Sequence, residues 1–156
     1  MIKHYSILAD YHQFYMWDHG ASPEAPTEYT ETDTVRRIKT APFLVVVQPE
    51  RNMEVPVEVE IMDGPPKLAL DVWDHVTEAS LALPSGKLEI HECTGGSIDI
   101  LTVPPGTYRV RSHHGGLATL SDDGLDGADH YRIVLWPAPF ADLAVLKQYV
   151  DPCTTS

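Results

Sequence analysis

Short stretches in which apolar and polar residues alternate dominate this chain, and they predict a mainly β protein. The clearest lies at residues 55–61, where Val55, Val57, Val59 and Ile61 alternate with glutamate and proline. A period of two residues is typical of a strand that buries one face and exposes the other. The proline cannot donate a ladder hydrogen bond, so we expect the start of this strand to lie towards a sheet edge.

Two more strands, at residues 107–111 and 130–136, bracket a long connector and organise the second half of the chain. In the first, Tyr108 and Val110 should face the core, because the other side carries threonine and arginine. The second is partly apolar on both sides, so we expect it to lie in the centre of a sheet. Arginines on the polar sides of the two strands should pair with acidic residues of the fold; they are Arg109, Arg111 and Arg132.

Five other segments are rich in strand-forming residues. They cover residues 5–17, 43–48, 75–83, 87–91 and 98–103. A bulge near Ala9 and Asp10 should divide the first, because both of its alternating faces carry bulky side chains. The continuous apolar run at 43–48 predicts a strand buried on both faces. The turn at 84–86 should join its flanking strands as a hairpin.

One helix is predicted, over residues 30–40, where early acidic and later basic residues suit the helix dipole. Its apolar side holds only Val35 and Ile38, and Pro42 ends it. Together with about eight strands, this predicts an antiparallel β-sandwich, with a curved, jelly-roll-like barrel as the alternative. The pattern at 138–150 selects neither helix nor strand.

The length of the chain and the spacing of its cysteines are typical of one ordinary domain that needs no disulfide bond. A chain of 156 residues is long enough for a single core, which we place in residues 1–150, followed by a disordered tail at 151–156. Cys93 and Cys153 are far apart and lack metal or redox spacing, so we expect free thiols.

The balance of charge narrows the possible partners. The formal net charge is −12, with 23 acidic residues against 11 lysines and arginines. This disfavours binding to a nucleic-acid backbone or to an anionic membrane surface, and is compatible with a basic protein partner. The first residues lack the apolar core of a signal peptide, and no apolar run is long enough to span a membrane, so we expect a cytoplasmic protein.

The connector at 112–129 is the first place to look for a site, because loops of this length in a compact domain are often functional. It ends in the run DDGLDGAD, and a partner could contact its carboxylates. The candidate partner-binding residues are Asp122, Asp123, Asp126 and Asp129, with Trp17 and Trp136 as possible aromatic anchors. The alternative is a solvated turn, in which aspartates cap backbone amides and glycine adopts a positive φ.

Three histidines raise a different hypothesis, a metal or small-ligand site in a cavity of the sandwich. They are His113, His114 and His130. Adjacent residues of a strand point to opposite faces, so His113 and His114 could share one ion only if they lie in a turn. A nucleophile elbow, a cysteine-protease signature and a phosphate-binding loop are all absent from the sequence, so we expect a non-enzymatic protein without a cofactor.

Two segments resemble a known family. Residues 11–14 (YHQF) and 98–110, which include PGTYRV, are similar to the corresponding pieces of competence protein J, the small acidic inhibitor of a DNA-entry nuclease. Stretches such as PPGTYRVR, LSDDGLDG and DHYRIVLWP also resemble a set of uncharacterised bacterial proteins, and that likeness implies no activity. The first resemblance implies a nuclease partner. The histidine pair and the DDGLDGAD run have no counterparts in that inhibitor, so its binding residues are not carried over to this chain.

Two functions therefore remain for comparison with the structure. The first is a non-enzymatic protein-binding module, such as a nuclease inhibitor or an immunity-type protein, that uses the aspartate run against a basic partner. The second is a metal- or small-ligand-binding sandwich, either a binding protein or a small enzyme, that uses the three histidines. The oligomeric state is not indicated by the sequence.

Overall fold

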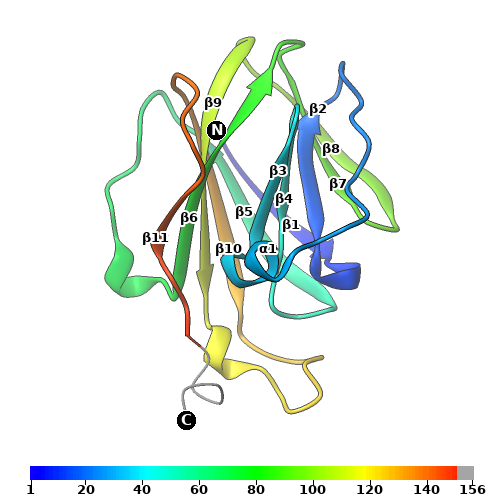
Figure 1. The fold of residues 1–156 in the computed structure, drawn as a ribbon, viewed down its shortest axis with the longest axis vertical. Coiled ribbons are helices and arrows are strands. Elements are labelled where there is room, and N and C mark those ends of the chain that lie inside the picture. The colour runs from blue at the N-terminus through cyan, green and yellow to red at the C-terminus, as the bar shows by residue number, and fades with distance from the viewer. Residues whose placement is uncertain (151–156) are drawn as a thin grey trace.

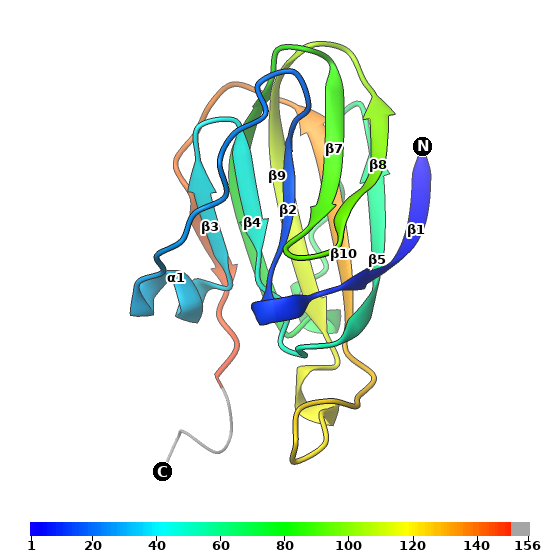
Figure 2. The same ribbon diagram turned by 90° about the vertical axis from the view of Figure 1, so that its right-hand side faces the viewer.

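Two β-sheets packed face to face form the body of the protein, with one short helix beside one end (Figures 1 and 2). The structure is a computed structural model that describes residues 1–150. Eleven strands occur in these residues, arranged as separate sheets of six and five strands. The predicted β-sandwich is therefore confirmed, and the curved barrel is not formed.

The larger sheet contains six strands in the spatial order β1-β5-β10-β9-β6-β11. Their bounds are β1 (Ile2–Leu8), β5 (Glu54–Ile61), β10 (His130–Pro137), β9 (Gly106–Gly115), β6 (His75–Leu83) and β11 (Ala144–Lys147). Neighbours are antiparallel except β5 and β10, which run parallel with Tyr131 opposite Val57. β10 thus has an antiparallel neighbour, β9, on one side and a parallel neighbour, β5, on the other. The expected central position of β10 is confirmed.

The smaller sheet is antiparallel throughout, in the order β3-β4-β2-β7-β8. Its strands are β3 (Ile38–Ala41), β4 (Leu44–Val47), β2 (Phe14–Asp18), β7 (Lys87–Glu92) and β8 (Gly96–Thr102). All four residues of β4 are buried, as the apolar run predicted.

Side chains from both sheets meet in one hydrophobic core. The alternation predicted for β5 is confirmed, with Val55, Val57 and Val59 inside. Tyr108 and Val110 of β9 also face inward. Burial of each large apolar side chain contributes about 1.5–3 kcal/mol, so the two facing layers hold the sheets together.

The predicted long first strand is two strands in different sheets. A 3₁₀ turn, Asp10–His12, separates β1 from β2 and carries the chain across the sandwich (Figure 2). Tyr11 and His12 both have left-handed backbones, with φ of 58° and 56°. The bulky residues on both faces thus reflect a change of sheet, where a bulge was expected.

The helix is shorter than predicted, because its second half is strand. Helix α1 covers Glu31–Arg36 and begins with a capping box formed by Thr30 and Asp33. Arg37 ends it in a left-handed conformation with φ of 59°. Ile38 is then fully buried opposite Val47 in β3, and this burial outweighs the weak helical pattern.

The expected hairpin at 84–86 is wrong, because β6 and β7 belong to different sheets. The buried carboxylate of Asp18, at the end of β2, accepts hydrogen bonds from the amide and the hydroxyl of Ser85. Gly86 turns the corner with φ of 68°, and a Cβ there would lie 2.6 Å from the carbonyl oxygen of Val103. The hairpin partner of β7 is β8.

Three smaller expectations are also corrected or completed. β5 is an internal strand, since β1 lies beside it, and its pairing with β10 begins at Val57, just after Pro56. β9 extends through Gly115, beyond the predicted 107–111. The segment 138–150, for which the pattern selects neither helix nor strand, contains the edge strand β11. A 3₁₀ turn, Leu70–Val72, precedes β6.

Cys93 has a free thiol, as expected. The predictions for Cys153 and for the tail at 151–156 lie outside the described residues. In residues 1–150 none of the helices has the length and apolar character needed to cross a membrane.

Candidate partner-binding end of the sandwich

The connector between β9 and β10 projects from one end of the sandwich as a loop (Figures 1 and 2, yellow to orange). It begins with a 3₁₀ turn, Leu117–Thr119, and its tip carries Asp122, Asp123 and Asp126, all exposed. Three carboxylates within a few residues concentrate negative charge at this tip. We refer to residues 121–128 as the acidic loop.

Hydrogen bonds within the acidic loop fix its shape. One carboxylate oxygen of Asp123 accepts from the hydroxyl of Ser121 and from the amide of Leu125, and these bonds lower the pKa of Asp123. The amide of Ser121 donates to the carbonyl of Asp126 at 2.7 Å. Gly124 has φ of 71°. The turn described above as the alternative for this run, with an aspartate capping a backbone amide and a glycine at positive φ, is therefore present, and it leaves the carboxylates of Asp122 and Asp126 exposed to solvent.

Contacts at the base of the loop attach it to the sandwich. The carboxylate of Asp74 accepts from the amide of Leu117 at 2.8 Å, and the hydroxyl of Thr119 accepts from the amide of Ala128 at 2.8 Å. Gly116 begins the connector with φ of 67°, and a Cβ there would lie 2.5 Å from the carbonyl oxygen of Ala128. The two ends of the connector are thus held close together.

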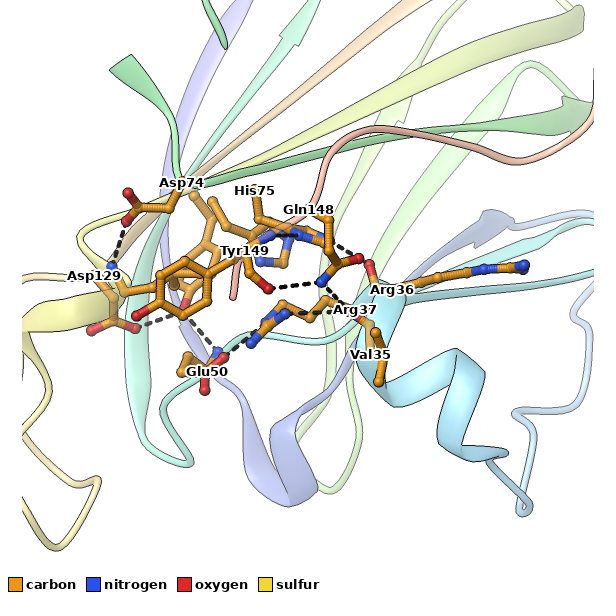
Figure 3. Close-up of polar contacts among 12 residues, drawn as sticks. Val35, Arg36, Arg37, Glu50, Asp74, His75, Asp129, Gln148 and Tyr149 are labelled. Carbon is orange, nitrogen blue, oxygen red and sulfur yellow. Dashed lines mark hydrogen bonds and ion pairs between the residues drawn. The ribbon is translucent and has the colours of Figure 1, made fainter. Parts of the chain in front are cut away.

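Asp129 occupies a different environment from the other three aspartates, because its side chain is buried. It accepts a hydrogen bond from the hydroxyl of Tyr131 at 2.7 Å and lies 2.8 Å from the guanidinium of Arg51. The amide of Glu50 donates to the same tyrosine hydroxyl (Figure 3). Burial, and then Asp129, raise the pKa of Tyr131. Asp129 therefore anchors the loop to β10 and to the turn before β5.

A second buried contact ties α1 and the C-terminal segment to this end. His75 hydrogen bonds through Nε2 to the carbonyl of Arg36 at 2.6 Å, and its Nδ1 accepts from the amide of Tyr149 at 3.0 Å (Figure 3). Burial is the main cause of the lowered pKa of His75, about 4. The side chain of Gln148 donates to the carbonyl of Val35. These contacts join α1 and the C-terminal segment to the start of β6, next to Asp74, which binds the start of the connector.

The two tryptophans lie at a distance from the acidic loop. Trp136 is buried, with the guanidinium of Arg111 5.0 Å from its ring centre. It lies at the far end of β10, six residues or roughly 20 Å from the loop end. Trp17 is half-buried on the smaller sheet, where it stacks on Tyr15 and donates to Glu89. The structure does not bring either ring next to the aspartates.

The three candidate histidines are also separated. His113 and His114 are consecutive residues of β9 and face opposite ways. His114 packs against Tyr131 on the core side, whereas His113 and the exposed His130 pack against Trp73 on the outer side. Across residues 1–150, no three His, Cys, Asp or Glu side chains are grouped so that they could hold a metal ion.

The arginines of β9 and β10 form ion pairs within the fold, as predicted. Arg109 and Arg111 are both buried on the outer face of the larger sheet and share the carboxylate of Glu78 at 3.0 and 2.9 Å. Arg109 also donates to two backbone carbonyls in the segment before β11. That segment covers a face that the alternation had assigned to solvent.

Sequence reasoning missed the residues that support the acidic loop. Arg51, Asp74 and Glu50 are not among the residues that the sequence pattern singles out. No local pattern could identify them, because each acts on a segment far away in the sequence. A pocket of about 420 Å³ at this end was also missed; its lining includes Tyr11, Tyr29, Arg37 and Glu50.

Comparisons with known proteins support the fold. A scan against models of protein families and a search of curated proteins find no match. Among solved structures, ComJ from Bacillus subtilis, an inhibitor of the DNA degrading activity of NucA, matches with a TM-score of 0.67 and 15% identity, over 88% of this chain and 96% of ComJ. The product of crocagin biosynthetic gene J matches with a TM-score of 0.53 and 23% identity, over 89% and 96%. The fold of this chain is therefore similar to that of ComJ, in agreement with the resemblance seen in the sequence.

Proposed function

We propose that this protein is a non-enzymatic binding module that inhibits a basic protein, such as a nuclease, and that the acidic loop makes the central contact. The observation that carries the proposal is the exposure of Asp122, Asp123 and Asp126 on a loop whose shape is fixed by its own hydrogen bonds. Nucleases bind a polyanion, and carboxylates can occupy the positions of phosphates in such a cleft.

The fold and the charge support this reading. ComJ, whose fold is similar over most of both chains, inhibits a DNA-degrading protein. The formal net charge of −12 would speed the encounter with a basic partner and would disfavour binding of nucleic acid to this protein itself. A loop with a fixed shape loses less conformational entropy on binding than a flexible one, so more of the contact energy appears as affinity.

The test is capture followed by inhibition. The immobilised protein is incubated with a lysate of its source organism at low salt, and captured proteins are released at high salt and identified. We expect a basic protein that degrades DNA, and we expect added chain to suppress this degradation in stoichiometric amounts. Capture of no DNA-degrading protein, or degradation that continues with excess chain present, would contradict the proposal.

A matched pair of variants assigns the contact to the loop. One variant carries Asp122→Asn, Asp123→Asn and Asp126→Asn. The control carries three exposed substitutions outside the loop, Glu24→Gln, Asp63→Asn and Asp142→Asn, and removes the same number of charges. We expect inhibition to weaken at least about tenfold in the loop variant and less than about twofold in the control.

A further inference from the structure

A second pocket lies on the outer face of the larger sheet, beside the base of the acidic loop. Its volume is about 320 Å³, and it spans β1, β5 and β10. The side chains that define its chemistry are His4, Pro56, Glu58, Trp73, His130 and Arg132. The pocket thus combines aromatic and imidazole rings with an ion pair.

The aromatic part of the pocket depends on a residue without a side chain. A Cβ on Gly115 would lie 2.5 Å from Nε2 of His130 and 3.1 Å from Cε3 of Trp73. Glycine therefore allows both rings to close over β9, where their centres lie 5.3 Å apart. Trp73 also packs on His113 at 5.2 Å, and these contacts hold the indole in place.

The charged part of the pocket is unbalanced. Arg132 forms ion pairs with Glu58 at 2.9 Å and with Glu60 at 2.6 Å. Two carboxylates thus face one guanidinium, and the other basic group at Glu58 is the exposed imidazole of His4, whose Nε2 lies 3.9 Å from the carboxylate. The side chain of Glu58 is 31% exposed, so it can contact a further cation.

The pocket is continuous with the acidic loop. Trp73 directly precedes Asp74, whose carboxylate binds the amide of Leu117 at the start of the connector. His130 directly follows Asp129, the buried anchor at its end. One partner surface can therefore contact the loop and the pocket together.

We propose that this pocket receives an arginine side chain from the basic partner, with its guanidinium against Trp73 and Glu58. The inference rests on the proposed function and extends it to a second contact. A cation beside an indole gains a cation–π interaction, and the exposed carboxylate of Glu58 supplies a charge-assisted hydrogen bond. Arginine suits the pocket better than lysine, because a planar guanidinium can stack on a ring and bind a carboxylate at the same time.

The test uses a small probe in place of the partner. N-acetyl-arginine amide is titrated into the ¹⁵N-labelled protein, and the indole N–H signal of Trp73 is followed by NMR, with Trp73→Phe providing its assignment. The control probe is N-acetyl-citrulline amide, which has nearly the same shape and no charge. We expect saturable shifts with the arginine probe and at least about fivefold weaker binding of the citrulline probe.

Two variants locate the charge that the probe binds. Glu58→Gln removes the negative charge from the pocket, and Arg132 retains its ion pair with Glu60. Glu54→Gln removes an exposed charge from the same strand, outside the pocket. We expect affinity for the arginine probe to fall at least about threefold in Glu58→Gln and to stay unchanged in Glu54→Gln.

These experiments distinguish failure of the pocket proposal from failure of the proposed function. Absence of a shift at Trp73, equal binding of the two probes, or equal effects of the two variants would overturn the pocket proposal and leave the nuclease-inhibitor proposal standing. Conversely, binding of the arginine probe supports the pocket even if the inhibition experiment fails.

Discussion

Buried histidines make the stability of this protein depend on pH. Burial lowers the pKa of His75 and of His113 to about 4, below the ordinary value of 6.5. The folded state thus holds these rings neutral, whereas the unfolded state protonates them near pH 6.5. Their stabilising contribution is complete above pH 6.5 and is lost as the pH falls towards 4.

We therefore expect the free energy of unfolding to decrease by about 2 kcal/mol for each of the two rings between pH 7 and pH 5. Urea unfolding at both pH values measures this change. In His75→Gln the decrease in the free energy of unfolding should be smaller by about 2 kcal/mol, the contribution of one ring. The control His12→Gln replaces an exposed histidine and should keep the full decrease. A wild-type protein equally stable at pH 5 and pH 7 would contradict the burial of neutral rings.

Two glycines of the connector differ in the space around them, although both have a positive φ. A Cβ at Gly116 would meet backbone atoms of Ala128, whereas a Cβ at Gly124 would meet no atom within 4 Å. Gly116→Ala should therefore cost about 2 kcal/mol or more and Gly124→Ala about 1 kcal/mol, because only the first adds a clash to the backbone strain. Denaturant unfolding tests this, and equal losses would show that the base of the loop can shift to relieve the contact.

At the scale of elements, one buried side chain contributes two of the hydrogen bonds that hold the segment before the edge strand β11. Arg109 donates to the carbonyls of Ala141 at 2.9 Å and Asp142 at 2.7 Å, just before the strand begins. Arg109→Met should remove these bonds and raise hydrogen exchange of β11 amides about tenfold, with β10 unaffected. Arg132→Met is the control, since the ion pairs of Arg132 lie with β5. Equal acceleration of β11 in both variants would exclude this anchoring role.

The alternation of apolar and polar residues predicted strands well but could not assign them to sheets. The same period of two describes β6 and β7, yet they lie in opposite sheets, because Gly86 and the buried Asp18 turn the corner between them. The missed boundary in the first segment has a similar cause. Two left-handed residues, Tyr11 and His12, change the sheet. Tyrosine rarely adopts such a backbone, and histidine, although enriched there, does so in only a small fraction of cases, so the pair gives no clear signal.

The candidate site was predicted only in part, for a related reason. All four aspartates of DDGLDGAD look alike in the sequence, and the turn formed by the first three follows from local residue types. The role of Asp129 depends on Arg51 and Tyr131, and the contact with Arg51 exists only because β5 pairs with β10. A single sequence carries no signal for that contact.

At the scale of the whole molecule, residues from both sheets share one core. We propose that residues 1–150 form one domain and expect a single unfolding transition. Tryptophan fluorescence reports on Trp17 in the smaller sheet, Trp136 in the larger one and Trp73 packed against β9, and far-ultraviolet circular dichroism reports on all strands. The midpoints of the two signals in urea should coincide. Separate midpoints would show that the sheets unfold independently and would contradict the single domain.

At the same scale, the net negative charge of the molecule and the position of the acidic loop support our central proposal. It is that a basic partner binds at the end of the sandwich that carries this loop. The most direct test is the association rate with the captured partner at about 0.05 M and about 0.5 M salt. The triple loop variant and the triple control variant described above are compared with the unmodified protein. We predict that the loop variant associates about tenfold more slowly at low salt and loses most of the salt dependence, while the control changes less than about twofold. Equal slowing in both variants would mean that only net charge matters, and unchanged rates in the loop variant would remove the acidic loop from the interface.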